Sequence, residues 1–268
     1  MTGFIGAGNM ANAIIKGMLA SEAVNGADIM IYDIDSKKVK TVCKLYGCCE
    51  ALTAVEVAEK CSEIVLAVKP YDFEKLLSEL DSTLKQHNPL IISIAAGNTT
   101  DYITSLLSYT PTLARVMPNI NATIGEAMSA YCTNERVTDE QKAFVETLCA
   151  SIGEVTELEE KHFSAFCAVA GSAPAFVYMI IDELARAGVK LGINKKVALK
   201  VATQTVLGSA KMVAESGEHP YELIDKVCSP GGTTIEGIAA LNENGLPNAV
   251  MQAVTAAYEK DKKLSEKK

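Results

Sequence analysis

A chain of 268 residues is too long for one small core and long enough for about two domains, and 49% of its residues are hydrophobic. We therefore expect a large buried core. The formal net charge of -8 argues against nucleic acid and anionic membranes as partners, because both require a basic face. Small molecules are the favoured ligands.

The cysteine and histidine pattern predicts a reduced protein without a metal site. The eight cysteines include the vicinal pair Cys48 and Cys49 but no Cys-x-x-Cys motif, and only three histidines accompany them. This pattern is typical of neither a disulfide framework nor a zinc site. Because the first residues carry no cationic segment followed by an apolar one, we expect a cytoplasmic protein. Residues 163–181 are apolar but interrupted by glycine and proline, which favours a buried or interface helix over a membrane span.

The first residues predict a strand, a glycine-rich turn, a helix and a second strand. Residues 2–5 form the short first strand, and the motif Gly6-x-Gly8-x-x-Ala11 opens a helix that runs to about Ala20. This motif is the dinucleotide-binding fingerprint in its alanine-ended form. The first glycine makes the tight turn, the second lets a pyrophosphate approach the backbone, and the small third residue allows helix and strand to pack closely. The strand before it and the helix after it favour a nucleotide site over a plain glycine turn.

Asp33 ends the second strand, which spans residues 28–33. An acidic residue there usually accepts a hydrogen bond from the adenosine ribose 2′-hydroxyl and repels a 2′-phosphate, so Asp33 favours NAD. Ser36, Lys37 and Lys38 follow and could face a phosphate, although lysines that open a helix are more often only solvated. The choice between NAD and NADP is open on these residues.

The β-α alternation continues with strands at residues 63–68, 89–94 and 112–116. In an open parallel sheet ligands bind beyond the carboxyl ends of the strands, so the segments after these strands should line one crevice with the glycine turn. Pro70 also suits the first position of a helix, and both roles are compatible. The predicted cofactor-binding residues are Ile5, Gly6, Ala7, Gly8, Asn9, Met10, Asp33, Lys37, Ala67, Val68, Lys69, Pro70, Ala95, Ala96 and Gly97.

The pattern changes at Glu159. A strand near residues 127–132, a helix over 138–151 and a strand over 154–158 complete the first half. Thereafter apolar residues recur at three- and four-residue intervals. Helices are predicted at residues 161–170, 174–191, 195–215, 220–227, 233–242 and 247–263. The fold class is therefore α/β, with an N-terminal Rossmann-type doubly wound sheet over 1–158 followed by an all-α domain over 159–268.

The helical half is too apolar for a lone bundle. Residues 176–181 and 197–202 place small and apolar side chains around most of the helix, which implies burial on more than one side. We favour a homodimer that packs these helices against a second copy. The alternative is a large intramolecular core.

A second glycine cluster, Ser229-Pro230-Gly231-Gly232-Thr233-Thr234, opens a late helix. Backbone N–H groups and threonine hydroxyls at the positive end of that helix could hold a small carboxylate. The structural alternative is an ordinary Ser/Thr-capped helix after a Pro-Gly turn.

Five motifs occur in order along the chain: Gly6-x-Gly8-Asn9-Met10, Ala67-Val68-Lys69-Pro70, Ser93-Ile94-Ala95-Ala96-Gly97, Arg115-Val116-Met117-Pro118-Asn119 and Ser229-Pro230-Gly231-Gly232-Thr233-Thr234. With them the chain resembles pyrroline-5-carboxylate reductase over essentially its whole length. The resemblance implies reduction of 1-pyrroline-5-carboxylate to proline with NADPH or NADH, in a helix-exchanging dimer that often builds larger rings. Family members commonly carry a small or hydroxyl residue where Asp33 stands, and an asparagine that lies near the adenosine ribose in some members corresponds to Ala54.

The substrate of that reaction carries one carboxylate and one C=N bond, and the late glycine turn can hold the carboxylate. Thr234 is the predicted catalytic residue because its hydroxyl could contact the ring nitrogen; capping its helix is the alternative. Glu160 aligns with an acidic residue near the substrate pocket of the family, although an acidic helix start explains it equally well. The predicted substrate-binding residues are Ser229, Gly231, Gly232, Thr233, Thr234 and Glu160.

Two other functions remain open at this stage. A dehydrogenase for another small acid, such as a hydroxy acid, would need a general acid/base on the first long helix of the second half. That helix offers no base before Arg186. A cofactor-binding sensor without turnover is the other alternative, and only the polar cluster at residues 229–234 argues against it.

Overall fold

The computed structural model describes residues 1–265, which separate into two compact units. The first unit comprises Met1–Gly171 together with the stretch that begins at Ala257, and the second comprises Ser172–Ala256. The predicted domain limit at residue 158 precedes this packing boundary, because the first helical turns after the sheet pack against sheet residues such as Met117. The predicted limit itself stays a prediction. The predicted class, a Rossmann-like sheet followed by a helical region, is confirmed.

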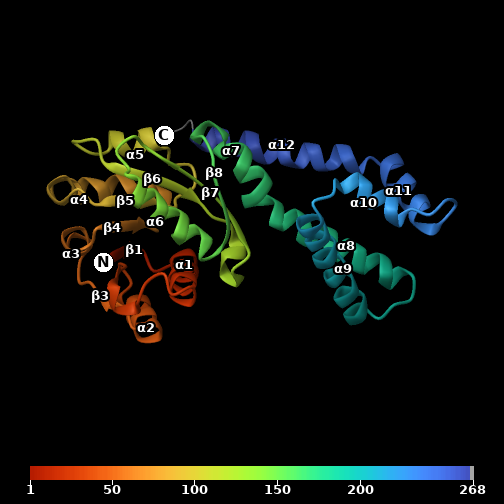
Figure 1. Cartoon of the computed structure of the whole chain (residues 1–268), viewed down its shortest axis with the longest axis horizontal. Helices are drawn as coiled ribbons and strands as arrows, with labels where there is room; N and C mark the ends of the chain where they lie inside the picture. The colour runs from red at the N-terminus through yellow and green to blue at the C-terminus, as the bar shows by residue number, and fades with distance from the viewer. Residues whose placement is uncertain (266–268) are drawn as a thin grey trace. The chain divides into compact units, whose positions relative to one another are not determined.

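The first unit is built on one eight-stranded sheet in the order β3-β2-β1-β4-β5-β6-β7-β8 (Figure 1). The strands are β1 (Thr2–Ile5), β2 (Ile29–Tyr32), β3 (Cys49–Glu50), β4 (Glu63–Leu66), β5 (Leu90–Ser93), β6 (Thr112–Met117), β7 (Ala127–Thr133) and β8 (Gly153–Glu157). Strands β1 to β6 are parallel, and their order reverses after β1, as in dinucleotide-binding sheets.

Strand β7 runs antiparallel to β6, whereas the sequence predicts a parallel sheet. Only a 3-10 turn, Ile120–Ile124, lies between these two strands, and a parallel crossover needs a longer connection. Strand β8 is parallel to β7 because a full helix joins them. The sheet therefore has six strands in one direction and two in the other.

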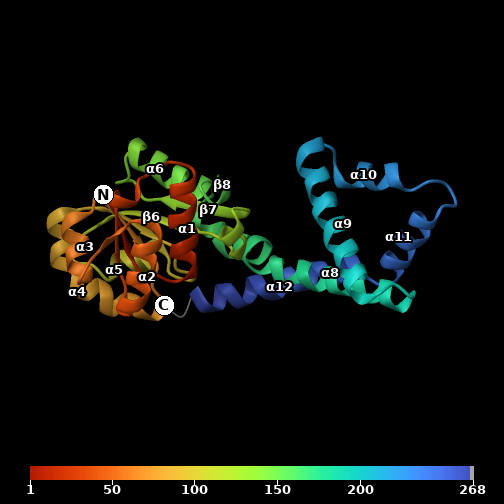
Figure 2. The ribbon, with the colours of Figure 1, turned by 90° about the horizontal axis from the view of Figure 1, so that it is seen from below.

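Helices cover both faces of the sheet (Figures 1 and 2). Apolar side chains of α1, α2 and α6 form one core with the sheet, and those of α3, α4 and α5 form the other. The central strands β1, β4, β5 and β6 are buried on both sides, which explains their largely apolar sequences. These helices are α1 (Asn9–Ala20), α2 (Ser36–Tyr46), α3 (Ala54–Lys60), α4 (Phe73–His87), α5 (Thr100–Ser105) and α6 (Asp139–Ala150).

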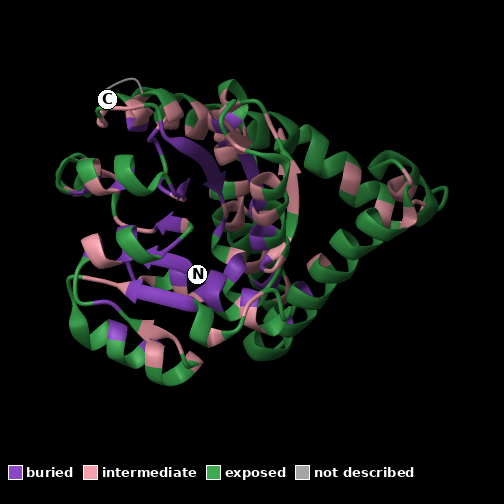
Figure 3. Ribbon diagram, turned by 60° about the vertical axis from the view of Figure 1, so that its left-hand side comes forward, coloured by how far each residue is buried: buried purple, intermediate pink, exposed green. Residues whose placement is uncertain are grey.

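The remaining helices follow the predicted segments closely. They are α7 (Phe163–Phe166), α8 (Ala173–Lys190), α9 (Lys195–Ser216), α10 (Pro220–Val227), α11 (Thr233–Glu243) and α12 (Leu246–Ser265). Helices α8 and α9 pack as a pair, and Gly188 allows a close approach: a Cβ there would lie 3.2 Å from Ala198 Cβ. Figure 3 shows buried strands in purple and these mostly exposed helices in green. Apolar side chains such as Met179 are open to solvent within one chain.

The predicted break at Gly171 is a π-helical stretch, Cys167–Ser172, that joins α7 to α8. Pro174 near the start of α8 has no N–H, so the carbonyl of Ala170 lacks its usual helical partner. The side-chain amide of Asn119 donates a 2.9 Å hydrogen bond to that carbonyl. The helical stretch Glu160–Lys190 is long and apolar enough to cross a membrane, but length and composition alone are weak evidence.

Candidate functional site

The fingerprint turn between β1 and α1 has the backbone geometry that only glycine accepts. Gly6 has φ of +110°, and a Cβ there would lie 2.6 Å from the carbonyl oxygen of Ala67. The N–H of Gly6 donates a 2.7 Å hydrogen bond to the carbonyl of Tyr32. The turn is therefore pressed between the segments that follow β2 and β4.

Gly8 differs from Gly6 because it faces open space. A Cβ built on Gly8 meets no atom within 4 Å, and its backbone is extended rather than left-handed. Gly8 is the N-cap of α1 and provides no side-chain cap. The side-chain amide of Asn12 holds the turn by donating to the carbonyls of Ala7 (3.0 Å) and Gly8 (2.9 Å). The N-terminus of α1 thus offers an uncovered cradle for a pyrophosphate.

Asp33 lies at this turn, as the sequence predicts. Its Oδ2 accepts a 2.8 Å hydrogen bond from the N–H of Ala7, and its Oδ1 accepts one of 2.8 Å from the N–H of Asp35. Asp35 in turn caps α2 by accepting from the N–H of Lys37 at 3.0 Å. A single carboxylate therefore joins the fingerprint turn to the segment that leads to Lys37.

The carboxyl ends of neighbouring strands lie in register. Ile5 of β1 pairs with Leu66 of β4, and Leu66 pairs with Ser93 of β5. The segments 67–70 and 95–97 therefore start side by side with the fingerprint turn. This arrangement brings the predicted cofactor-binding residues together at one edge of the sheet.

Two features fix the shape of these segments. Pro70 begins a 3-10 turn, Pro70–Asp72, and so occupies the helix-start position that its sequence favours. Gly97 has φ of +74°, and the side-chain amide of the buried Asn98 lies 3.5 Å from the carbonyl oxygen of Pro70. The loop after β5 is thus linked to the loop after β4.

The second glycine cluster lies in the helical unit and forms a turn that opens α11. Gly231 has φ of +64°, and the N–H of Gly232 donates a 3.0 Å hydrogen bond to the carbonyl of Ser229. Gly232 is the N-cap and has no side-chain cap hydrogen bond, so Thr234 is the second residue of α11 and not its cap. A Cβ on Gly232 would lie 2.3 Å from Ser229 Oγ. The turn is compatible with an anion at the start of α11.

Glu160 lies in the first unit, apart in packing from the second glycine cluster. Its Oε1 accepts hydrogen bonds of 2.8 Å from the N–H of Thr100 and of 2.8 Å from Nη1 of Arg115. Its Oε2 accepts a 2.5 Å hydrogen bond from the Thr100 hydroxyl. The sequence patterns did not predict either partner of Glu160. The available signal was Arg115, a charged residue in the middle of an apolar strand.

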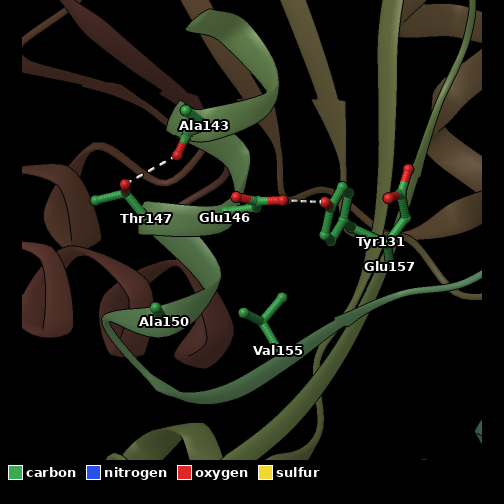
Figure 4. A pocket seen from close by; sticks show the side chains of 7 residues that line it. All are labelled: Tyr131, Ala143, Glu146, Thr147, Ala150, Val155 and Glu157. Carbon is green, nitrogen blue, oxygen red and sulfur yellow. Dashed lines mark hydrogen bonds between the residues drawn. The ribbon is translucent and has the colours of Figure 1, made fainter. Parts of the chain in front are cut away.

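Surface hollows of the first unit include two that border the sheet. One of about 450 Å³ is lined in part by Thr100, Cys132 and Glu160, and burial, then the nearby Glu160 carboxylate, raises the pKa of Cys132 to about 12. The other, of about 470 Å³, lies between α6 and strands β7 and β8 (Figure 4). There the Tyr131 hydroxyl donates to Glu146, and burial together with this bond raises the tyrosine pKa. None of the predicted site residues lines the second hollow.

Comparison with known proteins gives family matches over both halves of the chain. The family described as pyrroline-5-carboxylate reductase dimerisation matches residues 160–264. The family described as NADP oxidoreductase, coenzyme F420-dependent, matches residues 1–97.

Several relatives that match nearly the whole chain are pyrroline-5-carboxylate reductases. Pyrroline-5-carboxylate reductase of Escherichia coli (strain K12) is 42% identical, covering 98% of this chain and 97% of the relative. The solved pyrroline-5-carboxylate reductase of Coxiella burnetii has a TM-score of 0.93 at 31% identity and covers 98% of both chains. The Plasmodium falciparum pyrroline carboxylate reductase, solved with NADP bound, has a TM-score of 0.87 at 31% identity and covers 98% of this chain and 97% of that one.

Proposed function

Because this chain belongs to the pyrroline-5-carboxylate reductase family, we propose that it reduces L-1-pyrroline-5-carboxylate to L-proline with NAD(P)H. This reaction is the last step of proline biosynthesis. The observation that carries the proposal, besides the family itself, is the open cradle at Gly8 beside the Asp33 carboxylate. It is where a dinucleotide of this class is held.

The residues around the fingerprint turn fit NAD(P)H. A pyrophosphate can reach the N-terminus of α1 at Gly8, where no side chain intervenes. Asp33 and Lys37 would flank the adenosine ribose, and the loops at 67–70 and 95–97 would contact the ribose and nicotinamide end. When bound, the reduced cofactor supplies the hydride. The opposite charges of Asp33 and Lys37 leave both NADH and NADPH as cofactors within this proposal.

The turn at Ser229–Thr234 is the proposed substrate site. Its glycines leave the first backbone N–H groups of α11 accessible to a carboxylate, and Thr233 offers a hydroxyl there. Thr234 would contact the ring nitrogen, and this contact would orient the C=N bond. The imine is protonated to accept the hydride, and the proton can arrive from solution, so no strong acid is required at the site. Alignment of two reactants can lower a barrier by roughly 7–11 kcal/mol in the best cases. Direct contact of Glu160 with the substrate also stays a prediction.

The protein is a homo-oligomer, as the dimerisation region over residues 160–264 indicates. We propose that the basic assembly is a homodimer and that dimers form a larger ring. Only 6% of the most apolar part of Glu160–Lys190 is buried within the chain, so this apolar surface needs a partner. A second copy would cover it, and we propose a cytoplasmic enzyme without nucleic-acid or membrane partners.

The test is oxidation of NADH and NADPH with pyrroline-5-carboxylate, compared with reduction of NAD+ and NADP+ by a panel of 2-hydroxy acids. Cofactor oxidation with the imine alone supports the proposal. Reduction of NAD+ or NADP+ by the hydroxy acids instead would indicate a different dehydrogenase. Cofactor binding without turnover of any substrate would indicate a sensor.

A further inference from the structure

The hydrogen bonds of Glu160 give this residue a task that its predicted contact with substrate does not include. Glu160 starts the 3-10 turn Glu160–His162 after the sheet, yet its carboxylate reaches back to two distant segments. Both Oε1 and Oε2 bind Thr100, the first residue of α5. Two hydrogen bonds to one residue fix both its backbone and its side chain.

Arg115 holds the carboxylate in this place. Its side chain is only 3% exposed, and its guanidinium lies 4.6 Å above the ring centroid of Phe163. A buried guanidinium requires a counter-charge, and Glu160 provides it through the 2.8 Å ion pair. Ser93 at the end of β5 pairs with Arg115 in the sheet, so the anchor belongs to the same rigid sheet as the cofactor loops.

The loop from β5 to α5 runs between Ser93, which pairs with Arg115, and Thr100, which binds Glu160. It begins after Ser93, whose hydroxyl lies 3.4 Å from the N–H of Ala95, and it ends at Thr100. Gly97 in its middle has a left-handed backbone and no side chain that could pack against its neighbours. The position of Ala95–Gly97 therefore depends on Thr100 at the end of the loop, together with the contact between Asn98 and Pro70.

We propose that Glu160 is a positioning residue, which fixes Thr100 and through it the loop that contacts the nicotinamide end of the cofactor. This inference rests on the proposed function, which places residues 95–97 at that end. Glu160 then affects hydride transfer without touching the nicotinamide. The arrangement also depends on the charge of Glu160, because its carboxylate is the counter-charge of the buried Arg115 and accepts all three hydrogen bonds.

The test measures cofactor binding by calorimetry. Thr100→Val removes the hydroxyl donor and keeps the side-chain shape, while Thr100→Ser keeps the donor. We expect Thr100→Val to raise the Kd for NADPH by about three- to tenfold, the effect of one hydrogen bond. The Kd for ADP-ribose, which lacks the nicotinamide, should remain unchanged, and Thr100→Ser should bind NADPH as the wild type does. Glu159→Gln is the matched control, because Glu159 is 70% exposed and forms its ion pair with the neighbouring Lys161.

Glu160→Gln should weaken NADPH binding more than Thr100→Val does. It should show a larger isotope effect on kcat when the transferred hydride of NADPH is replaced by deuteride. Its KM for pyrroline-5-carboxylate should stay unchanged. The proposal is overturned if Thr100→Val leaves the NADPH Kd unchanged, or weakens ADP-ribose equally. It is also overturned if Glu160→Gln raises only the KM for the imine, because that result indicates direct substrate contact. If Glu160→Gln does not fold, the two Thr100 variants still decide the question. If the wild-type protein does not reduce the imine, the proposed function is wrong. The binding data test the positioning role of Glu160 separately.

Discussion

The N–H of Ala7 in the fingerprint turn donates a 2.8 Å hydrogen bond to Oδ2 of Asp33 at the end of the next strand. The second carboxylate oxygen accepts from the N–H of Asp35. Asp33 therefore has two tasks in this chain: it stabilises the turn, and it presents a negative charge where the adenosine ribose is expected. The two tasks can be separated by mutation.

Asp33→Ser removes the charge and keeps a hydroxyl that can still accept from the turn. We expect the preference for NADPH over NADH to rise about tenfold or more, because a like charge about 4 Å away costs roughly 1–4 kcal/mol near a protein surface. Steady-state kinetics with both cofactors measures the ratio of kcat/KM values. Asp35→Ser is the control, since serine preserves the cap of α2. An unchanged ratio in Asp33→Ser would show that Asp33 is not at the ribose.

Gly6 and Gly8 should respond differently to substitution by alanine. Gly6→Ala forces a Cβ to within 2.6 Å of the Ala67 carbonyl at a positive φ, so we expect a loss of stability of about 1–3 kcal/mol. Gly8→Ala meets no atom of the chain, so its melting temperature should equal that of the wild type. Its affinity for NADPH should nevertheless fall at least about tenfold, because the new methyl group occupies the pyrophosphate cradle. Tight cofactor binding by Gly8→Ala would place the pyrophosphate elsewhere.

Thr234→Ala tests the proposed substrate site. Loss of one hydrogen bond should raise the KM for pyrroline-5-carboxylate by about three- to tenfold and leave the Kd for NADPH near the wild-type value. Thr234→Ser should recover most of the loss because it restores the hydroxyl. Equal loss of substrate and cofactor binding would contradict the assignment.

The exposed apolar surface of the helical unit provides a test of the homodimer. Met179 on α8 is 67% exposed within one chain, so Met179→Glu should not disturb the monomer fold. It should convert the oligomer to monomers if a second copy covers this surface, because a buried unpaired carboxylate costs several kcal/mol. Light scattering coupled to gel filtration gives the mass. Lys75→Glu on α4 of the first unit is the control because Lys75 is exposed and lies outside the helical unit. An unchanged mass for Met179→Glu as well would exclude Met179 from the interface.

Thiol reactivity should follow burial. Burial raises the pKa of Cys149 to about 12 and that of Cys61 to about 11, from an ordinary value of 9.0. Both thiols therefore remain protonated in the folded protein at pH 9, whereas half of each is ionised in the unfolded chain. Alkylation mapped by mass spectrometry should be slow at pH 9 in buffer and fast in urea at both positions. The contribution of these protonated thiols to the free energy of unfolding is complete below pH 9. It falls as the pH rises from 9 toward their folded pKa values. Rapid native labelling of Cys149 would contradict the burial.

The local patterns of the chain predict most of its elements and the cofactor half of the site. Gly6, Gly8 and Asp33 lie within the first 33 residues, in one strand-turn-helix-strand unit. The motif specifies that unit, so the arrangement of these residues follows from local rules. The strand near residues 127–132 was predicted, but its antiparallel direction was not, since apolar strands carry no signal of direction. The links among Thr100, Arg115 and Glu160 were missed because they join residues 45 and 60 positions apart. Such pairs depend on tertiary packing, which a single sequence does not reveal.

The end of α12 belongs to the first unit, and Ser265 Oγ lies 3.8 Å from where a Cβ of Gly97 would be. The last turns of that helix are thus among the neighbours of the loop after β5, although the whole helical unit separates them along the chain. During synthesis on the ribosome, the early sheet can form long before this contact exists. The nascent first unit must therefore wait for the end of α12 before the loop after β5 has all its native neighbours.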